Sequence, residues 1–221
     1  MVFSKQQTFF SVMLGLKKQD LLQELRNIRS VAMASVDAQG NPKNRIIDVM
    51  LADENAIYFC TARGKAFYQE LMMKPVIAIT GMNASWQMIR LQGEVEHLTK
   101  QVMWIDKIFM ENPQMKQVYP KDSRYILEAF KVAKGVLEWF DLGKEPINRE
   151  CLRMEDDVQL LQDGYQIQTN CIGCNKCLSS CPQQCIKQGK PYHIVQSHCL
   201  HCGLCYELCP VHAIRKITEC A

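Results

Sequence analysis

Apolar and polar residues alternate along most of the first 142 residues, which is the pattern of half-buried strands. The alternation at 30–37 and 44–51, with a turn at 38–41 between them, predicts a β-hairpin. Further strands are predicted at 56–61, 75–81, 85–98 and 136–142. Six short antiparallel strands with few helices are typical of a β-barrel.

Apolar residues recur at helical spacing between these strands. A helix or helix pair is predicted up to about Ile28, and further helices at 64–74, 100–112 and 122–130. We interpret Thr8–Leu16 as the buried face of an N-terminal helix rather than a signal peptide, because charged residues follow it and no small-residue cleavage site does. No apolar run is long enough to span a bilayer, so we expect a cytoplasmic protein with no membrane partner.

Composition and charge narrow the class of protein. The 221 residues, 48% hydrophobic and 22% charged, suit one globular domain of ordinary size and a second, smaller one. From Cys171 onward the chain carries five Lys and Arg against two Glu, which equals the whole formal charge of +3. The preceding residues are therefore balanced, and we expect no nucleic-acid partner.

Eight of the twelve cysteines lie in two similar runs, CIGCNKCLSSCP from Cys171 and CLHCGLCYELCP from Cys199. A disulfide framework is disfavoured, because the chain shows no secretion signal and all but two cysteines follow position 170. Zinc sites are built from paired C-x-x-C units, whereas each run here has three cysteines at x2, x2 spacing and then a fourth before proline. This is the bacterial ferredoxin pattern, in which the fourth cysteine binds the other cluster.

The two runs therefore predict two [4Fe-4S] clusters with crossed ligands. The first cluster is assigned to Cys171, Cys174, Cys177 and Cys209, and the second to Cys199, Cys202, Cys205 and Cys181. The repeat extends further: residues 165–167 correspond to 193–195 as short strands, and Ile186 corresponds to Ile214 as an apolar residue over each cluster. From about Gly164 the tail resembles ferredoxins with two [4Fe-4S] clusters, which implies a small α+β domain.

The repeat departs from symmetry at two positions. Cys185 stands where the second run has Ala213, and Asn175 where it has Gly203. We interpret Cys185 as a small packing residue near a cluster rather than a ligand. The remaining thiols, Cys60, Cys151 and Cys220, have no ligand spacing, and His198, His201 and His212 are read as neighbours of the clusters and not as iron ligands.

The first part of the chain carries a second resemblance. Its residues are the hairpin turn at Gly40, Arg45–Ile47, Thr61–Lys65, Lys74–Ile79 and Trp86–Gln87. In order and spacing, residues 15 to 142 resemble the pyridoxamine 5′-phosphate oxidase-like, FMN-binding split-barrel family. The resemblance implies a six-stranded antiparallel split β-barrel, mainly β with flanking helices, and a homodimer with FMN at its interface. We expect this domain over 1–150, a linker over 151–163 and the ferredoxin domain over 164–221.

Physical chemistry and the resemblance together select flavin contacts. The dianionic phosphate of FMN favours Arg, Lys, hydroxyl and backbone N–H donors at a helix start, where Thr61 and Lys65 lie, with Arg45 on the neighbouring strand pair. The resemblance adds main-chain contacts and a glutamine that reaches the flavin from the same or the partner subunit. The predicted set is Arg45, Ile46, Ile47, Thr61, Ala62, Arg63, Lys65 and Gln87, and no catalytic residue is identified.

The segment after Leu142 separates this chain from true pyridoxamine phosphate oxidases. Their substrate-binding Arg and His segment has no match here, and a polar connector from Gly143 to Asp163, expected to be a flexible coil, follows instead. We therefore expect an FMN-dependent iron–sulfur oxidoreductase with a small-molecule substrate. One alternative is an electron carrier or redox sensor without its own substrate that docks on an external redox protein. Another is a haem or deazaflavin in the barrel.

Overall fold

The computed structural model describes residues 15–220, and they form two compact units. The barrel unit contains the chain up to Met82, Ile89–Leu137 and Leu152–Val158. The tail unit contains Asn83–Met88, Glu138–Cys151 and the chain from Gln159 onward. The predicted apolar helix face at Thr8–Leu16 lies almost entirely outside the described residues.

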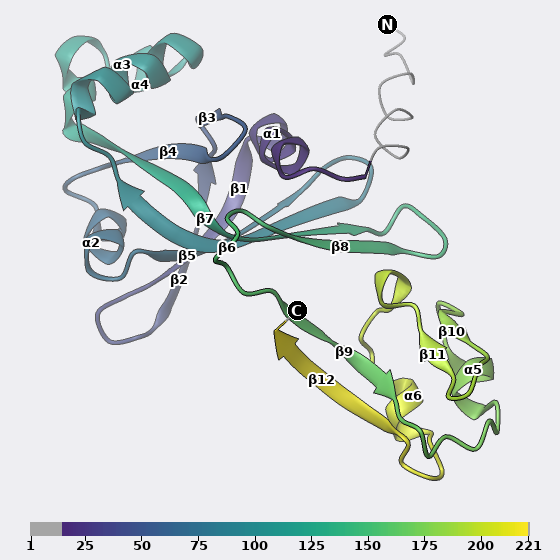
Figure 1. Cartoon of the computed structure of the whole chain (residues 1–221). Helices are drawn as coiled ribbons and strands as arrows, with labels where there is room; N and C mark the ends of the chain where they lie inside the picture. Colours follow the sequence, from purple (N-terminus) through teal and green to yellow (C-terminus); the bar gives the residue numbers. More distant parts are fainter. Residues whose placement is uncertain (1–14, 221) are drawn as a thin grey trace, which may run out of the picture. The chain divides into compact units, whose positions relative to one another are not determined.

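A curled sheet forms the centre of the barrel unit (Figure 1). The strand order is β2-β1-β5-β6-β7-β4-β3, and β8 pairs with β7. The strands are β1 Ser30–Val36, β2 Pro42–Asp48, β3 Leu51–Ala52, β4 Ile57–Ala62, β5 Val76–Met82, β6 Gln87–His97, β7 Leu127–Asp141 and β8 Asn148–Arg153. The antiparallel registers of β1 with β2 and β5, and of β4 with β7, confirm the mainly β, split-barrel class. The sheet has two strands more than the six predicted.

The sequence prediction of a helix at 122–130 is wrong for most of that segment. Only Lys121–Ile126 is helical, as a short 3-10 turn, and β7 then runs for 15 residues from Leu127. Burial along β7 outweighs the local helical spacing, because Leu127, Ala129 and Phe130 all enter the core. The long strand also needs glycine at position 135, where φ is +155° and an added Cβ would lie 2.1 Å from the Gln92 carbonyl oxygen.

In the described part of the barrel unit, four α-helices accompany this sheet: α1 Lys18–Ile28, α2 Ala66–Met73, α3 Gln101–Glu111 and α4 Met115–Val118. The amphipathic α1 buries Leu21, Leu22 and Leu25, as its sequence predicts. Within residues 15–220, no helix has both the length and the apolar character needed to cross a membrane.

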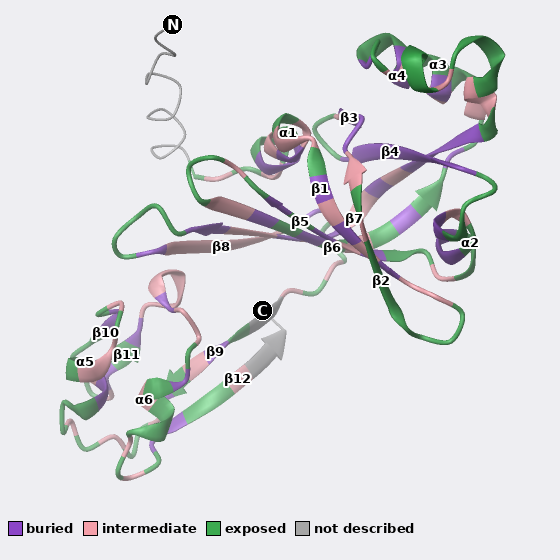
Figure 2. Cartoon of the chain, turned by 180° about the vertical axis from the view of Figure 1, so that it is seen from behind, coloured by how far each residue is buried: buried purple, intermediate pink, exposed green. Residues whose placement is uncertain are grey.

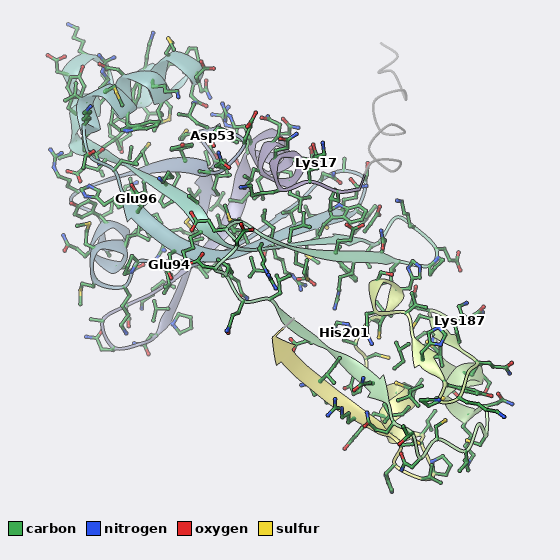
Figure 3. All side chains as sticks on the ribbon, viewed as in Figure 1. Lys17, Asp53, Glu94, Glu96, Lys187 and His201 are labelled. Carbon is green, nitrogen blue, oxygen red and sulfur yellow. The ribbon has the colours of Figure 1, made fainter. Side chains whose placement is uncertain are left out.

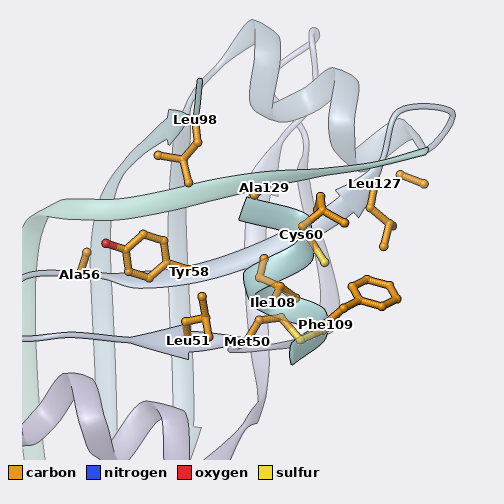
Figure 4. Close-up of a cluster of buried hydrophobic side chains, with 12 residues drawn as sticks. Met50, Leu51, Ala56, Tyr58, Cys60, Leu98, Ile108, Phe109, Leu127 and Ala129 are labelled. Atoms are coloured by element: carbon orange, nitrogen blue, oxygen red, sulfur yellow. The ribbon is translucent and has the colours of Figure 1, made fainter. Parts of the chain in front are cut away.

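The core of the barrel unit is centred on β4, which is buried along its whole length (Figure 2). Phe59 of β4 stacks on Phe67 of α2 and on Phe130 of β7, with ring centroids 5.9 and 5.5 Å apart. A second apolar cluster joins β3 and β4 to α3 around Tyr58 and Cys60 (Figure 4). Burial raises the pKa of Cys60 to about 12, so this thiol is an unreactive core residue.

In the tail unit, β9 Leu161–Ile167 pairs antiparallel with β12 Ile214–Cys220, and β10 Ile186–Lys187 with β11 His193–Ile194. Between them lie α5 Lys176–Ser180, the 3-10 turn η3 Gln196–His198 and α6 Leu204–Glu207. The strands predicted at 165–167 and 193–195 are present as the end of β9 and as β11. This is the expected small α+β domain.

The segment expected to be a flexible connector is partly a strand. β8 crosses the boundary predicted after residue 150, and the beginning of β6 and the end of β7 group with the tail unit. The charged residues of β8 do not follow the pattern of a buried strand, so the sequence did not predict it. In the fold they can be accommodated, because Arg149 pairs with Glu138 of β7 at 3.2 Å.

Candidate functional site

Two pockets in the tail unit gather the cysteines of the two runs. The pocket that we call the first is lined by Cys171, Cys174, Cys177 and Cys209. The second pocket is lined by Cys181, Cys199, Cys202 and Cys205, together with Cys185. The structure thus brings together each set of four cysteines assigned from the sequence, including the crossed fourth member. Among the described residues no three His, Cys, Asp or Glu side chains are set to bind one ion. A cubane cluster does not require this, because each thiolate binds a different iron.

Paired isoleucines line each pocket. Ile167 and Ile214 are register partners in β9 and β12 and line the first pocket. Ile186 and Ile194 are register partners in β10 and β11 and line the second. All four side chains are buried, so each set of cysteines lies against an apolar surface, as expected for Ile186 and Ile214 from the sequence repeat.

Backbone conformation explains why the two runs differ where they do. Asn175 and Gly203 precede α5 and α6, and both have a left-handed backbone, with φ of 65° and 83°. Asparagine tolerates this region better than other residues with a side chain, and its Oδ1 accepts a 2.6 Å hydrogen bond from the Tyr192 hydroxyl. At position 203 a Cβ would lie 2.8 Å from the Tyr165 hydroxyl oxygen, so that turn requires glycine.

Cys185 is a fifth thiol at the second pocket. It is 3% exposed, and its Sγ lies 3.5 Å from Sγ of Cys181. A hydrogen bond to Cys199, together with burial, raises the pKa of Cys185, and the same hydrogen bond lowers the pKa of Cys199. Cys185 is therefore a buried thiol packed against the sulfur of Cys181 at the edge of the second pocket.

The 147–149 segment, whose last two residues begin β8, is bound to the loops of the second pocket. The amide of Ile147 donates to Oε1 of Gln183 at 3.0 Å, and Nδ1 of His198 lies 2.8 Å from the Ile147 carbonyl oxygen. The Arg149 guanidinium contacts the imidazole of His201, which Figure 3 labels, and stacks over Phe140 at 4.7 Å. His198 and His201 are thus neighbours of the pocket and have partners other than cysteine. Sequence reasoning missed this segment.

On the barrel unit, Arg45 is held by partners that the sequence did not reveal. Its Nη2 donates to Oε2 of Glu70 at 2.7 Å and its Nη1 to Ser35 at 2.5 Å, while Ser35 also hydrogen bonds to Glu70. The guanidinium lies 4.2 Å from the Phe67 ring centre. Glu70 and Ser35 are buried, so this arginine is fixed against α2 and not solvated. Among residues 15–220, two of its five N–H groups have recorded hydrogen bonds, which leaves the others to meet an anion.

The other predicted phosphate contacts surround the start of α2. Thr61 and Ala62 end β4 and are buried, whereas Arg63 and Lys65 are exposed. Lys65 is the N-cap of α2, no side chain caps it, and the first turn of the helix contains no acidic residue. An uncapped, acid-free helix start beside a lysine suits a phosphate. Arg63 instead turns to the start of β7 and the 3-10 turn before it, donating to the Tyr125 carbonyl at 2.9 Å and to Glu128 at 3.2 Å.

A polar group missed by the sequence reasoning lies next to this helix. Glu128 of β7 is the register partner of Thr61 and accepts hydrogen bonds from Tyr68, His97 and Arg63. Burial opposes ionisation of Glu128, but these hydrogen bonds outweigh it and lower its pKa. The prediction of a helix at 122–130 concealed this residue, because only the strand places it opposite Thr61.

The remaining flavin candidates lie on separate strands. Ile46 of β2 is 67% exposed, and Ile47 is half-buried beside it. Gln87 begins β6 within the tail unit, where its amide donates to Asp141 at 3.1 Å. Ile46 directly follows Arg45 on β2, so the two side chains point to opposite faces of the strand.

Two family models match the chain. The model described as pyridoxamine 5′-phosphate oxidase matches residues 18–129, just over half of the chain. The model described as a 4Fe-4S dicluster domain matches residues 166–216. Among curated proteins, no sequence match is found.

Solved structures resemble the barrel part. A NimC/NimA family protein from Clostridium acetobutylicum is 22% identical, with a TM-score of 0.53 over 61% of this chain and 90% of its own. A pyridoxamine 5′-phosphate oxidase-related, FMN-binding protein from Nostoc punctiforme is 18% identical, with a TM-score of 0.47 over 62% and 88%. General stress protein 26 from Bacillus anthracis is 13% identical, with a TM-score of 0.49 over 61% and 97%. The first of these supports the fold alone. By its family model, the chain belongs to the pyridoxamine 5′-phosphate oxidase family and carries a 4Fe-4S dicluster domain after the barrel.

Proposed function

We propose that this protein is an iron–sulfur flavoprotein oxidoreductase that passes electrons between two [4Fe-4S] clusters and a barrel-bound FMN. The observation that carries the proposal is the convergence of the cysteines into two pockets with four assigned ligands each, in a chain whose other part belongs to a flavin-binding family. The acceptor or donor at the flavin is a small molecule.

The residues at the start of α2 would hold the flavin phosphate. Lys65 and the free N–H groups of Arg45 would bind the dianion, and the first-turn amides of α2 would add their dipole. Following the family, the main chain at Ile46 and Ile47 would contact the flavin ring, and Gln87 would reach the flavin from the same or the partner subunit. When bound, FMN accepts and donates electrons singly or in pairs, so it can join one-electron and two-electron reactions.

The cysteine pockets would supply the one-electron side. All-cysteine ligation and the apolar isoleucine pairs are the features that set cluster potential, together with hydrogen bonds to sulfur. In the second pocket, the amide of His201 donates to Sγ of Cys199 at 3.4 Å. These thiols must stay reduced to bind iron, so we place the protein in the cytoplasm. Following its family, we also propose a homodimer.

The experiment is an anaerobic purification followed by cofactor analysis and reduction of the full chain. We expect eight irons, eight acid-labile sulfides and one FMN per chain, with broad absorption near 400 nm. A photochemically generated one-electron donor should reduce the flavin. The Cys171→Ser/Cys199→Ser variant should retain FMN but lose donor-driven flavin reduction, while a matched Cys151→Ser variant should keep both.

Other results would redirect the proposal. Stoichiometric zinc without absorption near 400 nm would reject the clusters, and a haem or deazaflavin spectrum would reject FMN. If the double variant reduces its flavin as fast as the unaltered protein, the clusters serve an external partner and the electron-carrier alternative holds.

A further inference from the structure

Three lysines lie in the segment that carries Cys171, Cys174 and Cys177 of the first pocket, and no acidic residue lies near them in sequence. The segment from Asn170 to Tyr192 contains Lys176, Lys187 and Lys190 and no Asp or Glu. All three side chains are exposed, and within the described part of the chain none of them is recorded in an ion pair. Three positive charges without recorded ion pairs give this part of a small domain a positive potential, which would attract an anionic partner.

Hydrogen bonds bring these lysines to one loop cluster. Lys176 itself lines the first pocket. The Gln188 amide donates to Oδ1 of Asn175 at 3.4 Å, and the Tyr192 hydroxyl donates to the same oxygen at 2.6 Å. The 187–192 loop, which carries Lys187 and Lys190, is therefore tied to the turn that precedes Lys176. Lys187, labelled in Figure 3, is the exposed last residue of β10, next to Ile186 of the second pocket, and the loop that it begins is the one tied to Asn175.

The two pockets differ in what surrounds them. The loops of the second pocket bind the 147–149 segment through Gln183, His198 and His201. Among the described residues, the recorded hydrogen bonds of the first-pocket loops stay within residues 165–215, as with Tyr192 to the Gly173 carbonyl at 3.3 Å. Ile172 of the first pocket is 64% exposed. Transient protein-docking surfaces commonly combine an exposed apolar residue with charged residues around it.

We propose that the first-pocket face, formed by Ile172, Lys176, Lys187 and Lys190, is the docking surface for an acidic one-electron carrier protein. This inference rests on the proposed function, because it assigns the external end of the electron route to the first pocket. The second-pocket loops are occupied by the chain's own 147–149 segment, so the carrier would meet the other end of the tail. Charge complementarity would set the encounter rate, and Ile172 would make the apolar contact.

The exchange is a balanced one-electron transfer. The carrier is oxidised by one electron and the tail is reduced by one electron, and no bond is made or broken. The carrier's own cofactor supplies the electron, so no further reductant is required. Electron transfer at this face requires only a weak, short-lived complex, which is normal for redox partner proteins.

The test uses reduced flavodoxin, an acidic one-electron protein, and the anaerobic full chain in a stopped-flow instrument. We expect Lys176→Glu/Lys187→Glu/Lys190→Glu to lower the second-order rate constant roughly tenfold or more at low ionic strength. The loss should shrink as salt is added, because the Debye length falls to roughly 3 Å at 1 M. Electron loss from the reduced variant to cytochrome c, a basic acceptor, should instead become faster.

A matched control separates position from net charge. Lys100→Glu/Lys116→Glu/Lys121→Glu changes three exposed lysines of the barrel unit and shifts net charge by the same amount. This control should leave both rates close to those of the unaltered protein. Equal effects of the two triple variants, or no effect of the first at low salt, would overturn the proposal. The proposal would also be overturned if methyl viologen reduced the unaltered protein and flavodoxin did not.

Iron content and the absorption near 400 nm, measured on every variant, separate this failure from failure of the proposed function. If clusters and FMN are present and methyl viologen reduces them, but the lysines do not control the flavodoxin rate, only the docking surface is rejected.

Discussion

Nη1 of Arg149 lies 2.6 Å from Nδ1 of His201 and so joins the start of β8 to the loop that carries Cys199 and Cys202. Arg149 is also paired with Glu138 and stacked over Phe140, so its position is well determined. Its charge lies next to one cysteine pocket. The two pockets, so similar in sequence, therefore differ in their electrostatic surroundings.

Replacing Arg149 should change the potential of one cluster selectively. A nearby positive charge stabilises an added electron, so Arg149→Gln should make the second-pocket cluster harder to reduce. We expect roughly a tenfold change in the one-electron equilibrium, which is about 59 mV. Arg149→Lys, which keeps the charge, should shift it less, and the first-pocket cluster is the internal reference. A redox titration followed by electron paramagnetic resonance measures both, and equal shifts in both clusters would contradict the assignment.

The crossed ligands can be tested one at a time. Cys181→Ser should damage the cluster held mainly by Cys199, Cys202 and Cys205, and Cys209→Ser should damage the other. Iron analysis and the spectrum of the surviving cluster distinguish the two variants. If Cys181→Ser removes the cluster of the first pocket, the ligand partition is wrong.

Lys65 should discriminate between FMN and riboflavin. Lys65→Ala removes a charge-assisted contact to phosphate, which contributes about 1.5–3 kcal/mol, or roughly tenfold to a hundredfold in affinity. Riboflavin, which lacks the phosphate, should lose much less. Flavin fluorescence titration of the apoprotein gives both constants, and Lys100→Ala serves as the exposed control. Equal losses for the two flavins would place Lys65 away from the phosphate.

Arg45 should matter for stability as well as for flavin. Arg45→Ala leaves Glu70, whose side chain is 8% exposed, without its cation, and breaking a buried pair in this way costs roughly 3–5 kcal/mol. Adding Glu70→Gln should recover part of that loss, because the uncompensated charge is removed. Urea unfolding of the two variants and the parent, without flavin, measures the difference. No recovery in the double variant would show that the cost arises from lost packing on Phe67.

Glu128 should make the barrel unit acid-sensitive. Its folded-state pKa is lowered from 4.5, so the stability that it contributes is present above that value and is lost as the pH falls through the lowered pKa. Between about pH 5 and about pH 3, Glu128→Gln should therefore lose less stability than the parent. Unfolding followed by Trp104 fluorescence, with the other two tryptophans replaced by phenylalanine, reports on this unit. Parallel pH profiles would contradict the inference.

Much of the architecture is a local property of this chain. The spacing of eight cysteines predicts two sets of four, because iron–sulfur ligation fixes how many residues separate three thiolates around one cluster. The alternation at Ser30–Val36 and the break before Pro75 predict a hairpin and a helix end, because both depend on neighbouring residues alone. Order and spacing of the loose motifs around Arg45 and Lys65 were enough to identify the barrel family.

What only the tertiary structure decided depends on residues far apart in the chain. Glu70 and Ser35 became partners of Arg45 through the packing of α2 on the sheet, and no local pattern records such a contact. The segment at Leu127 became a strand because β4 offered it a long register, which outweighed its helical spacing. Arg149, predicted to lie in a flexible connector, met His201 because β8 pairs with β7. Burial and long-range pairing set these positions. A local sequence pattern shows which residue types are present but not which distant residue each will contact.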